Sequence, residues 1–375
     1  MYNPFTKIFS SKGIFSDSSG DSVVGVDIGT SSIKVVELKR KAGKVLLETY
    51  GAIALGPYAD VEVGRVTNLP LDKTVEALKE LLKQSGVNSK STAFAIPVQS
   101  SLIFTLALAP QIKDSDLPSV VPVEARRYIP VPINEVAIDY FVLPEKEPSF
   151  EEMHLENGTP ATENKKNILV VATQNDAVSR YRSLVAECEL VAPFFEIEIF
   201  SSVRANFEHE LSLVLLMDFG ASRTKLSLVE FGTVKSYHTI NRGGAEITDS
   251  IAKSLSIPFF EAEKMKKEYG LFGGGSDKEL ADIIKVHTDY IFSEANAVVL
   301  GYEKKYNKTV SKIIFSGGGS LMKGLKEVAA NNFQAQIEIG HPFSKVGAPA
   351  FLDKVLATMG PEFAVSIGLA LRKLQ

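Results

Sequence analysis

Two short segments of the sequence carry an aspartate, a glycine, a serine and a lysine at identical spacing. The first is Asp27-Ile28-Gly29-Thr30-Ser31-Ser32-Ile33-Lys34, and the second is Asp218-Phe219-Gly220-Ala221-Ser222-Arg223-Thr224-Lys225. Both follow the pattern Asp-x-Gly-x-Ser-x-x-Lys after an apolar run. Their offset of 191 residues (218 − 27) is about half of the 375-residue chain. That spacing indicates a duplicated domain rather than a solenoid, whose repeats are about 20–50 residues long.

The residue types in these segments are suited to binding phosphate. Glycine permits a tight bend and lets the backbone approach a ligand. Successive backbone N–H groups and nearby hydroxyls can cradle phosphate oxygens. Each aspartate can hold Mg²⁺, usually through water, because this ion keeps several waters and takes few carboxylates. The predicted metal residues are Asp27 and Asp218, and the predicted phosphate residues are Gly29, Thr30, Ser31, Ser32, Lys34, Gly220, Ser222 and Thr224.

Each segment alone is weak evidence, because Asp-x-Gly in a hairpin is more often only a turn. Two copies in matching register make the phosphate interpretation stronger. A third element, Ser316-Gly317-Gly318-Gly319-Ser320, joins an apolar strand to a helix. Such a turn lets backbone contact a nucleotide, and a helix N-terminus favours anions. We therefore predict that Gly317, Gly318 and Gly319 contact the nucleotide, although a lone Gly-rich turn has many structural explanations.

These three elements, in this order, resemble the phosphate-1, phosphate-2 and adenosine motifs of the actin-like ATPase superfamily, over residues 22 to 375. The resemblance implies an α/β, ribonuclease H-like duplicated fold of two domains, with subdomains 1A, 1C, 2A and 2B and a nucleotide cleft between the domains. It also implies ATP or ADP with Mg²⁺ as the cofactor.

A further match lies in the second half of the chain. Gly243–Thr248 followed by Glu261–Lys266 resembles a signature shared by MreB, FtsA and PilM. In that pattern Glu263 and Lys266 line the adenosine pocket, and Gly244 is added to the predicted nucleotide contacts. The alternative is an ordinary solvated helix face with charges three residues apart.

An insertion in the first half of the chain, over residues 99–184, indicates which family of this superfamily the sequence resembles most. Glu124–Pro130, Glu135 and Asp139-Tyr140 look like the PilM family, as does the final Gly368–Arg372. FtsA normally carries a C-terminal linker and an amphipathic membrane helix. The chain stops at Gln375, directly after the last predicted helix, and this favours the PilM family.

Resemblance to the PilM family implies a type IV pilus (or type II secretion-like) assembly component at the cytoplasmic face of the inner membrane. It implies an ATP-binding scaffold that docks the N-terminal cytoplasmic peptide of PilN between subdomains 1A and 1C and is linked to the pilus motor. The groove should involve the region from Gln99 to Tyr140. Arg126 and Arg127 could meet an acidic peptide, and a solvated helix face is the slightly favoured alternative.

Apolar spacing predicts the elements that position these motifs. Strands are predicted over 23–26, 33–38, 44–53, 92–96, 102–108, 135–143, 168–173, 211–217, 226–230, 234–240 and 312–315. Helices are predicted over 71–85, 120–128, 176–187, 247–256, 261–269, 280–306, 321–331 and 361–374, with a mobile loop over 144–167. The predicted organisation is a flexible tail (1–21), subdomain 1A (22–98 and 185–211), 1C (99–184), 2A (212–245 and 308–375) and 2B (246–307).

Hydrolysis of a nucleotide needs an acid or amide to orient the attacking water. In related folds that residue lies on the segment linking the two halves, which here is 194–200. Its alternation predicts a strand with both glutamates on one face. Glu198 is the first catalytic candidate and Glu196 the second. Solvent-facing strand carboxylates are the alternative, so enzyme activity stays open and any ATPase is expected to be slow, with nucleotide acting as a clamp on the two domains.

Composition narrows the functional classes. A net charge of −4 makes nucleic acid an unlikely main partner. The single cysteine, Cys188, cannot form an internal disulfide, and its apolar neighbours predict a buried side chain. No apolar run reaches the roughly 20 residues of a membrane helix, so membrane contact is expected only through a partner. Three alternatives remain. The first is an FtsA-like filament-forming protein, for which self-association is expected. The second is a carbohydrate or metabolite kinase, for which no convincing base is found, and the third is a degenerate fold that binds no nucleotide.

Overall fold

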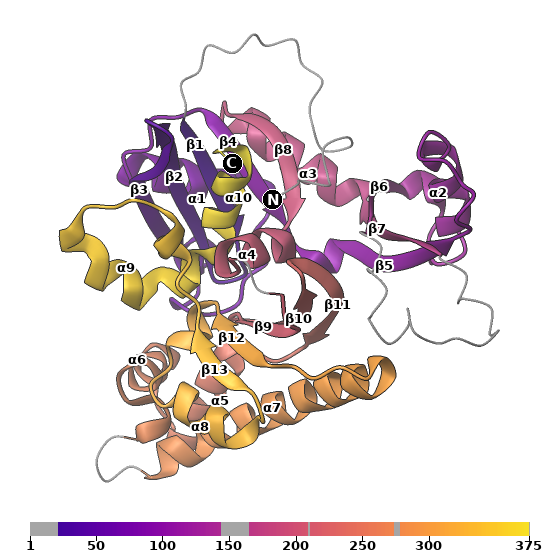
Figure 1. Ribbon diagram of the computed structural model, residues 1–375. Helices are drawn as coiled ribbons and strands as arrows, with labels where there is room; N and C mark the ends of the chain where they lie inside the picture. Colours follow the sequence, from indigo (N-terminus) through magenta and orange to yellow (C-terminus); the bar gives the residue numbers. More distant parts are fainter. Residues whose placement is uncertain (1–21, 144–164, 209–210, 274–277, 375) are drawn as a thin grey trace. The chain divides into compact units, whose positions relative to one another are not determined.

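The structure is a computed structural model that describes residues 22–143, 165–208, 211–273 and 278–374 (Figure 1). Contacts divide the described chain into two compact units. The smaller unit contains residues 96–143 and 165–183, and the larger contains 22–95 and the described residues from 184 onward. The predicted tail (1–21) and most of the predicted loop (144–164 of 144–167) lie outside the described residues. The finer division into 1A, 2A and 2B stays a prediction.

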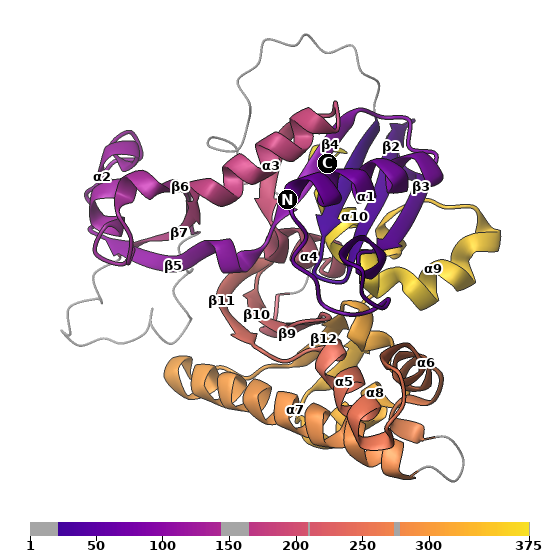
Figure 2. The same cartoon turned by 180° about the vertical axis from the view of Figure 1, so that it is seen from behind.

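The first sheet of the larger unit has the order β3-β2-β1-β4-β8. Its strands are β1 (Ser22–Ile28), β2 (Ser32–Lys41), β3 (Lys44–Ala54), β4 (Ser91–Ile96) and β8 (Val191–Ile197). β1 pairs antiparallel with β2 and parallel with β4. Helix α10 (Ala364–Leu374) packs on one face and α1 (Leu71–Gln84) on the other (Figures 1 and 2). Burial of both sheet faces explains the almost continuous apolar sequence of β1 and β4.

The second sheet repeats this plan, with the order β11-β10-β9-β12-β13. Its strands are β9 (Val214–Phe219), β10 (Thr224–Glu230), β11 (Thr233–Ile240), β12 (Lys312–Ser316) and β13 (Gln336–Ile339). As in the first sheet, the first two strands, β9 and β10, form an antiparallel hairpin. The first strand, β9, also pairs parallel with β12, which comes later in the chain. Four helices accompany this half: α5 (Gly244–Leu255), α6 (Phe259–Tyr269), α7 (Lys278–Tyr306) and α8 (Leu325–Asn332). The duplication predicted from the motif offset is therefore confirmed.

The smaller unit has a three-stranded antiparallel sheet of order β5-β7-β6. The strands are β5 (Ser101–Leu108), β6 (Val136–Val142) and β7 (Lys166–Gln174), with helix α2 at Leu117–Ala125. Leu106, Val121 and Val170 belong to a separate apolar core that holds α2 on the sheet. Helix α3 (Asn175–Glu187) leads from β7 back into the larger unit.

Several element predictions were wrong. The predicted strand over 194–200 ends at Ile197, where helix α4 (Glu198–Asn206) begins. The helix predicted from Leu321 begins at Leu325, because residues 318–321 form a 3₁₀ turn. β13 and helix α9 (Asp353–Met359) were missed. Each of these elements is short, and a short apolar run does not separate strand from helix by periodicity alone.

In the described part of the chain, one stretch, Ala350–Leu374, has the length and apolarity of a membrane span. It is not one continuous helix, because it contains α9, α10 and 3₁₀ turns. About two thirds (67%) of the 18 most apolar consecutive residues in this stretch are buried inside the protein. Ile367 and Leu371 belong to the core that packs against β1 and β2. Its apolarity therefore reflects core packing. Cys188 is buried as predicted, and burial raises the pKa of its thiol to about 11.

Candidate functional site

The two motif copies form two hairpins of the same construction. In the first, Asp27 lies opposite Lys34 across β1 and β2, and the Gly29 N–H donates to the Ser32 carbonyl at 3.0 Å. In the second, Asp218 lies opposite Lys225, and the Gly220 N–H donates to the Arg223 carbonyl at 2.9 Å. Each hairpin thus places a carboxylate and an ammonium group beside a glycine turn.

Three charged side chains from different elements meet beside the second hairpin. The Lys225 Nζ lies 2.7 Å from Glu198 Oε2 and 3.2 Å from Asp218 Oδ2. Lys225 is on β10, Asp218 is on β9, and Glu198 is the first residue of α4. Their side chains are 16%, 16% and 10% exposed. The predicted Glu198 and the predicted Asp218 are therefore joined by one lysine.

The surroundings of this cluster change the titration of two groups. Burial raises the pKa of Asp27 to about 6; Lys34 and Lys225 oppose this shift, and the charges of Glu198 and Asp218 add to it. Burial disfavours the charge of Lys225, but Asp218 and Glu198 outweigh it and raise its pKa. Lys225 therefore remains an ammonium ion at all ordinary pH values, next to carboxylates from both halves of the repeat.

The Gly-rich turn lies directly against the second hairpin. Ser316 at the end of β12 pairs with Asp218. Gly317 has a φ of +79°, and a Cβ added there would lie 2.3 Å from Asp218 Oδ1. A Cβ on Gly319 would lie 2.1 Å from the Phe219 ring. Glycine is therefore required at both positions, because a side chain would clash with Asp218 at position 317 and with the Phe219 ring at position 319.

Gly317→Ala is expected to destabilise the protein by roughly 1–3 kcal/mol, because alanine rarely adopts this backbone conformation, and to weaken Mg-ATP binding by displacing Asp218. Gly43→Ala is the control: Gly43 also has a positive φ (+77°), but open space surrounds it. Thermal unfolding and nucleotide titration of both variants measure the two effects. Equal nucleotide affinity in both variants would contradict the proposed contact between this turn and the site.

Glu263 and Lys266 form a shielded network rather than a solvated helix face. The Lys266 Nζ donates to the Gly244 carbonyl at 2.8 Å, to Thr248 Oγ1 at 2.7 Å and to Glu263 Oε2 at 2.7 Å. Burial disfavours the Glu263 carboxylate, but Lys266 and Thr248 outweigh it and lower its pKa. Burial lowers the pKa of Lys266. Gly244, Glu263 and Lys266, which were predicted as nucleotide contacts from the sequence, therefore lie together around the Lys266 ammonium group.

Two predicted site residues occupy other roles. The Thr224 side chain is fully buried, and its hydroxyl donates to the Arg242 carbonyl at 2.9 Å. This hydrogen bond holds the segment between β11 and Gly243 against the hairpin, so the Thr224 hydroxyl is used within the protein. Ser222, in the same turn, keeps a half-exposed side chain. The Thr224 prediction is therefore corrected.

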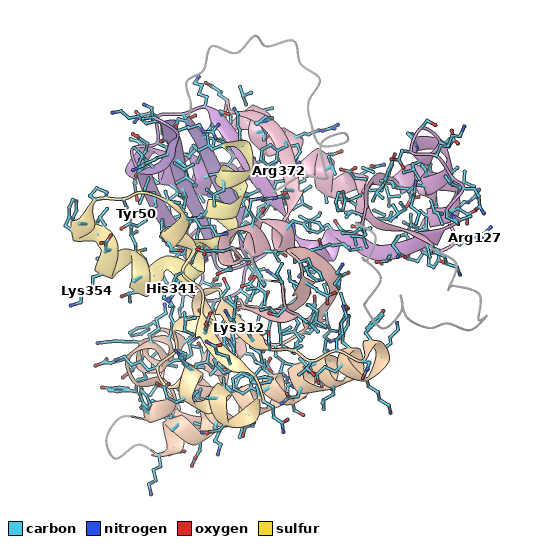
Figure 3. All side chains as sticks on the ribbon, in the orientation of Figure 1. Tyr50, Arg127, Lys312, His341, Lys354 and Arg372 are labelled. Carbon is cyan, nitrogen blue, oxygen red and sulfur yellow. The ribbon has the colours of Figure 1, made fainter. Side chains whose placement is uncertain are left out.

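Glu196 is also separated from the cluster, because Glu198 starts a helix instead of continuing the strand. Its side chain is only 1% exposed and accepts hydrogen bonds from Arg204 at 2.7 Å and from Arg372 at 2.9 Å. Figure 3 labels Arg372, which comes from α10. Burial disfavours the Glu196 charge, but the two arginines and Ser201 outweigh it and lower its pKa. A carboxylate held in this way is a structural ion pair, and we exclude Glu196 from the catalytic residues.

Sequence reasoning missed Lys225 as a site residue. The motif comparison contained the signal, because Lys225 occupies the same place as the predicted Lys34. Only the fold shows that its ammonium group reaches Glu198. In the described ranges, no group of three or more His, Cys, Asp or Glu side chains is placed to hold a metal ion.

Comparison with known proteins places this arrangement in context. The chain resembles the cell division protein FtsA of Pseudomonas aeruginosa, with 26% identity over 95% of this chain and 90% of the relative. The FtsA of Neisseria meningitidis is also 26% identical, over 92% and 88%.

Solved structures share the fold. The "PilM-PilN type IV pilus biogenesis complex" has a TM-score of 0.76 and 23% identity over 94% of this chain and 98% of that chain. The ethanolamine utilization protein EutJ of Carboxydothermus hydrogenoformans has a TM-score of 0.53 and 16% identity, over 93% and 89%. The model of the family "Type IV pilus assembly protein PilM" matches residues 25–374. The chain therefore belongs to the PilM family of type IV pilus assembly proteins, within the actin-like ATPase superfamily.

Proposed function

We propose that this protein is a nucleotide-binding scaffold of the type IV pilus assembly platform, working at the cytoplasmic face of the inner membrane. The observation that carries the proposal is the pair of matching hairpins, whose charged groups converge with Glu198. Two glycine turns with facing carboxylates and ammonium groups supply the donors that a triphosphate and Mg²⁺ need. Membership of the PilM family supports the assignment to pilus assembly.

The donor set fits Mg-ATP or Mg-ADP. Asp27 and Asp218 would hold the metal, largely through water, because Mg²⁺ takes few carboxylates. The bound metal would neutralise phosphate charge. Gly317 approaches Asp218 so closely that a methyl group would not fit, and such close backbone approach is typical of nucleotide turns. The other proposed contacts are Gly29, Thr30, Ser31, Ser32, Lys34, Gly220 and Ser222 for phosphate, and Gly244, Glu263, Lys266, Gly318 and Gly319 for adenosine.

Glu198 is the residue proposed to orient water for hydrolysis, because its carboxylate lies in the charged cluster at the start of α4. Glu198→Gln is expected to lower the ATPase rate by roughly 10²–10⁴-fold, the usual contribution of a general base, while Mg-ATP still binds. Phosphate release under single-turnover conditions measures the rate. Glu196→Gln is the comparison and should leave the rate of the folded protein within a few-fold. A wild-type protein without hydrolysis would remove the catalytic role of Glu198.

The proposed partner is the N-terminal cytoplasmic peptide of a PilN-like inner-membrane protein. The support is the PilM–PilN complex, which shares the fold of this chain, together with family membership. Fluorescence anisotropy of a labelled PilN-like peptide with the full chain tests it, and a scrambled peptide of the same composition is the control. Saturable binding of the native peptide alone is the expected result. Equal binding of both peptides would contradict the scaffold role, and coupling to the pilus motor would be examined next.

An FtsA-like filament-forming role is the alternative, because FtsA relatives align with nearly the whole chain. The PilM family match makes it the weaker proposal. Sedimentation with and without Mg-ATP separates the two, since a filament pellets at high speed and a scaffold that does not polymerise stays in the supernatant.

A further inference from the structure

Lys225 differs in its contacts from the lysine at the equivalent place of the first hairpin. Lys34 lies opposite Asp27, and its Nζ donates to the Ser32 hydroxyl at 2.9 Å. Lys225 lies opposite Asp218, but its Nζ reaches Glu198 in the other half of the repeat at 2.7 Å. The two motifs are thus alike in sequence and unlike in charge pairing.

This pairing places one fixed cation between two carboxylates. Asp218 Oδ2 is 3.2 Å from the ammonium nitrogen, which is within hydrogen-bonding distance. The carboxylate that we propose as a metal residue therefore already has a positive partner. Because the three side chains are at most 16% exposed, water screens their interaction far less than it would at the surface.

We propose that Lys225 is a built-in cation that shares Asp218 with Mg²⁺, so that nucleotide binding depends less on the metal than it would with a neutral residue there. This inference rests on the proposed nucleotide-binding function and concerns the regulation of the same site. Lys225 acts by positioning Asp218 and Glu198 and by supplying charge.

The physical reason lies in the balance of charges. Asp27, Asp218 and Glu198 are three carboxylates, and a triphosphate brings further negative charge to them. With Lys225 present, one ammonium group offsets part of this repulsion even without metal. With Lys225 neutral, Lys34 still lies beside Asp27, but the ammonium group that contacts both Asp218 and Glu198 is lost. Mg²⁺ must then supply the positive charge at Asp218, and it meets no competitor there. Removing the lysine should therefore weaken metal-free binding and lower the Mg²⁺ concentration needed for half-maximal binding.

The experiment measures the Kd of a fluorescent ATP analogue with Mg²⁺ and with EDTA, using the full chain stripped of nucleotide. For Lys225→Met, we expect the ratio of the Kd in EDTA to the Kd in Mg²⁺ to rise roughly tenfold or more. The reason is the loss of a unit positive charge that lies 3.2 Å from the Asp218 carboxylate. Lys34→Met is the matched control: it removes the equivalent lysine and should weaken binding by a similar factor in both conditions. Lys225→Arg should keep the wild-type ratio.

A second variant covers the case in which Lys225→Met does not fold. Lys225→Gln also removes the positive charge, but its amide N–H can still donate to Glu198 or Asp218, so it should fold while showing the same raised ratio. Circular dichroism confirms the fold of each variant before titration. A ratio equal to that of the wild type in the folded variants with a neutral residue at position 225 would overturn the inference while leaving nucleotide binding intact. Failure of the wild type to bind nucleotide in either condition would overturn both proposals.

Discussion

Replacing Asp27 and Asp218 together by asparagine is expected to abolish the stabilisation of this protein by Mg-ATP. At 100 times its Kd, a ligand stabilises the folded state by about 2.7 kcal/mol, and the melting temperature should rise by several degrees. Both aspartates are the second-last residue of the first strand of their hairpin and lie opposite a lysine on the second strand. Asparagine keeps the size of each side chain and removes the charge that holds the metal, so folding should be retained.

Thermal unfolding with and without Mg-ATP measures this effect on nucleotide-free protein. The matched control replaces two exposed aspartates, Asp72 on α1 and Asp282 on α7, by asparagine. This control should keep the full ligand-induced shift. A full shift in the Asp27/Asp218 variant would show that the two hairpins do not hold the metal–nucleotide complex. A stripped wild-type protein that does not respond to millimolar Mg-ATP would leave a docking scaffold without a nucleotide switch.

Glu196→Ala is expected to destabilise the protein by about 3–5 kcal/mol, the range found when one partner of a buried ion pair is removed. The Glu196 side chain is 1% exposed, and Arg372, one of the arginines that it pairs with, is 4% exposed. Arg204 also donates to the Gly368 carbonyl at 2.9 Å, so the cluster connects α4 with α10. Alanine would remove the buried carboxylate that Arg204 and Arg372 share.

The control for this prediction is Glu76→Ala. Glu76 pairs with Lys73 on the surface of α1, and both side chains are about half exposed. Exposed pairs contribute about 0–1 kcal/mol, so the melting temperature should change little. Chemical denaturation of both variants gives the comparison. A loss of unfolding free energy in Glu196→Ala that is no larger than the loss in Glu76→Ala would mean that Glu196, Arg204 and Arg372 together contribute no net stability. The packing of α10 alone would then hold this part of the core.

Much of the site follows from local sequence. A hairpin is formed by neighbouring residues, so Asp27 and Lys34, or Asp218 and Lys225, are brought together by about eight residues of chain. The spacing of glycine and apolar residues therefore predicted both turns, and the repeat predicted two similar sheets. The Gly-rich turn after β12 was predicted for the same reason, because strand, turn and helix are consecutive there.

Only the tertiary structure separated Glu196 from Glu198 and joined Glu198 to Lys225. The two glutamates are two residues apart, and alternation placed them on one strand face; the chain instead turns into α4 at Glu198. Glu196 then faces arginines from α4 and α10, and Glu198 faces a lysine from the other sheet. These partners are up to 176 residues away along the chain. Such contacts depend on how helices pack on the two sheets, and local periodicity carries no information about that packing.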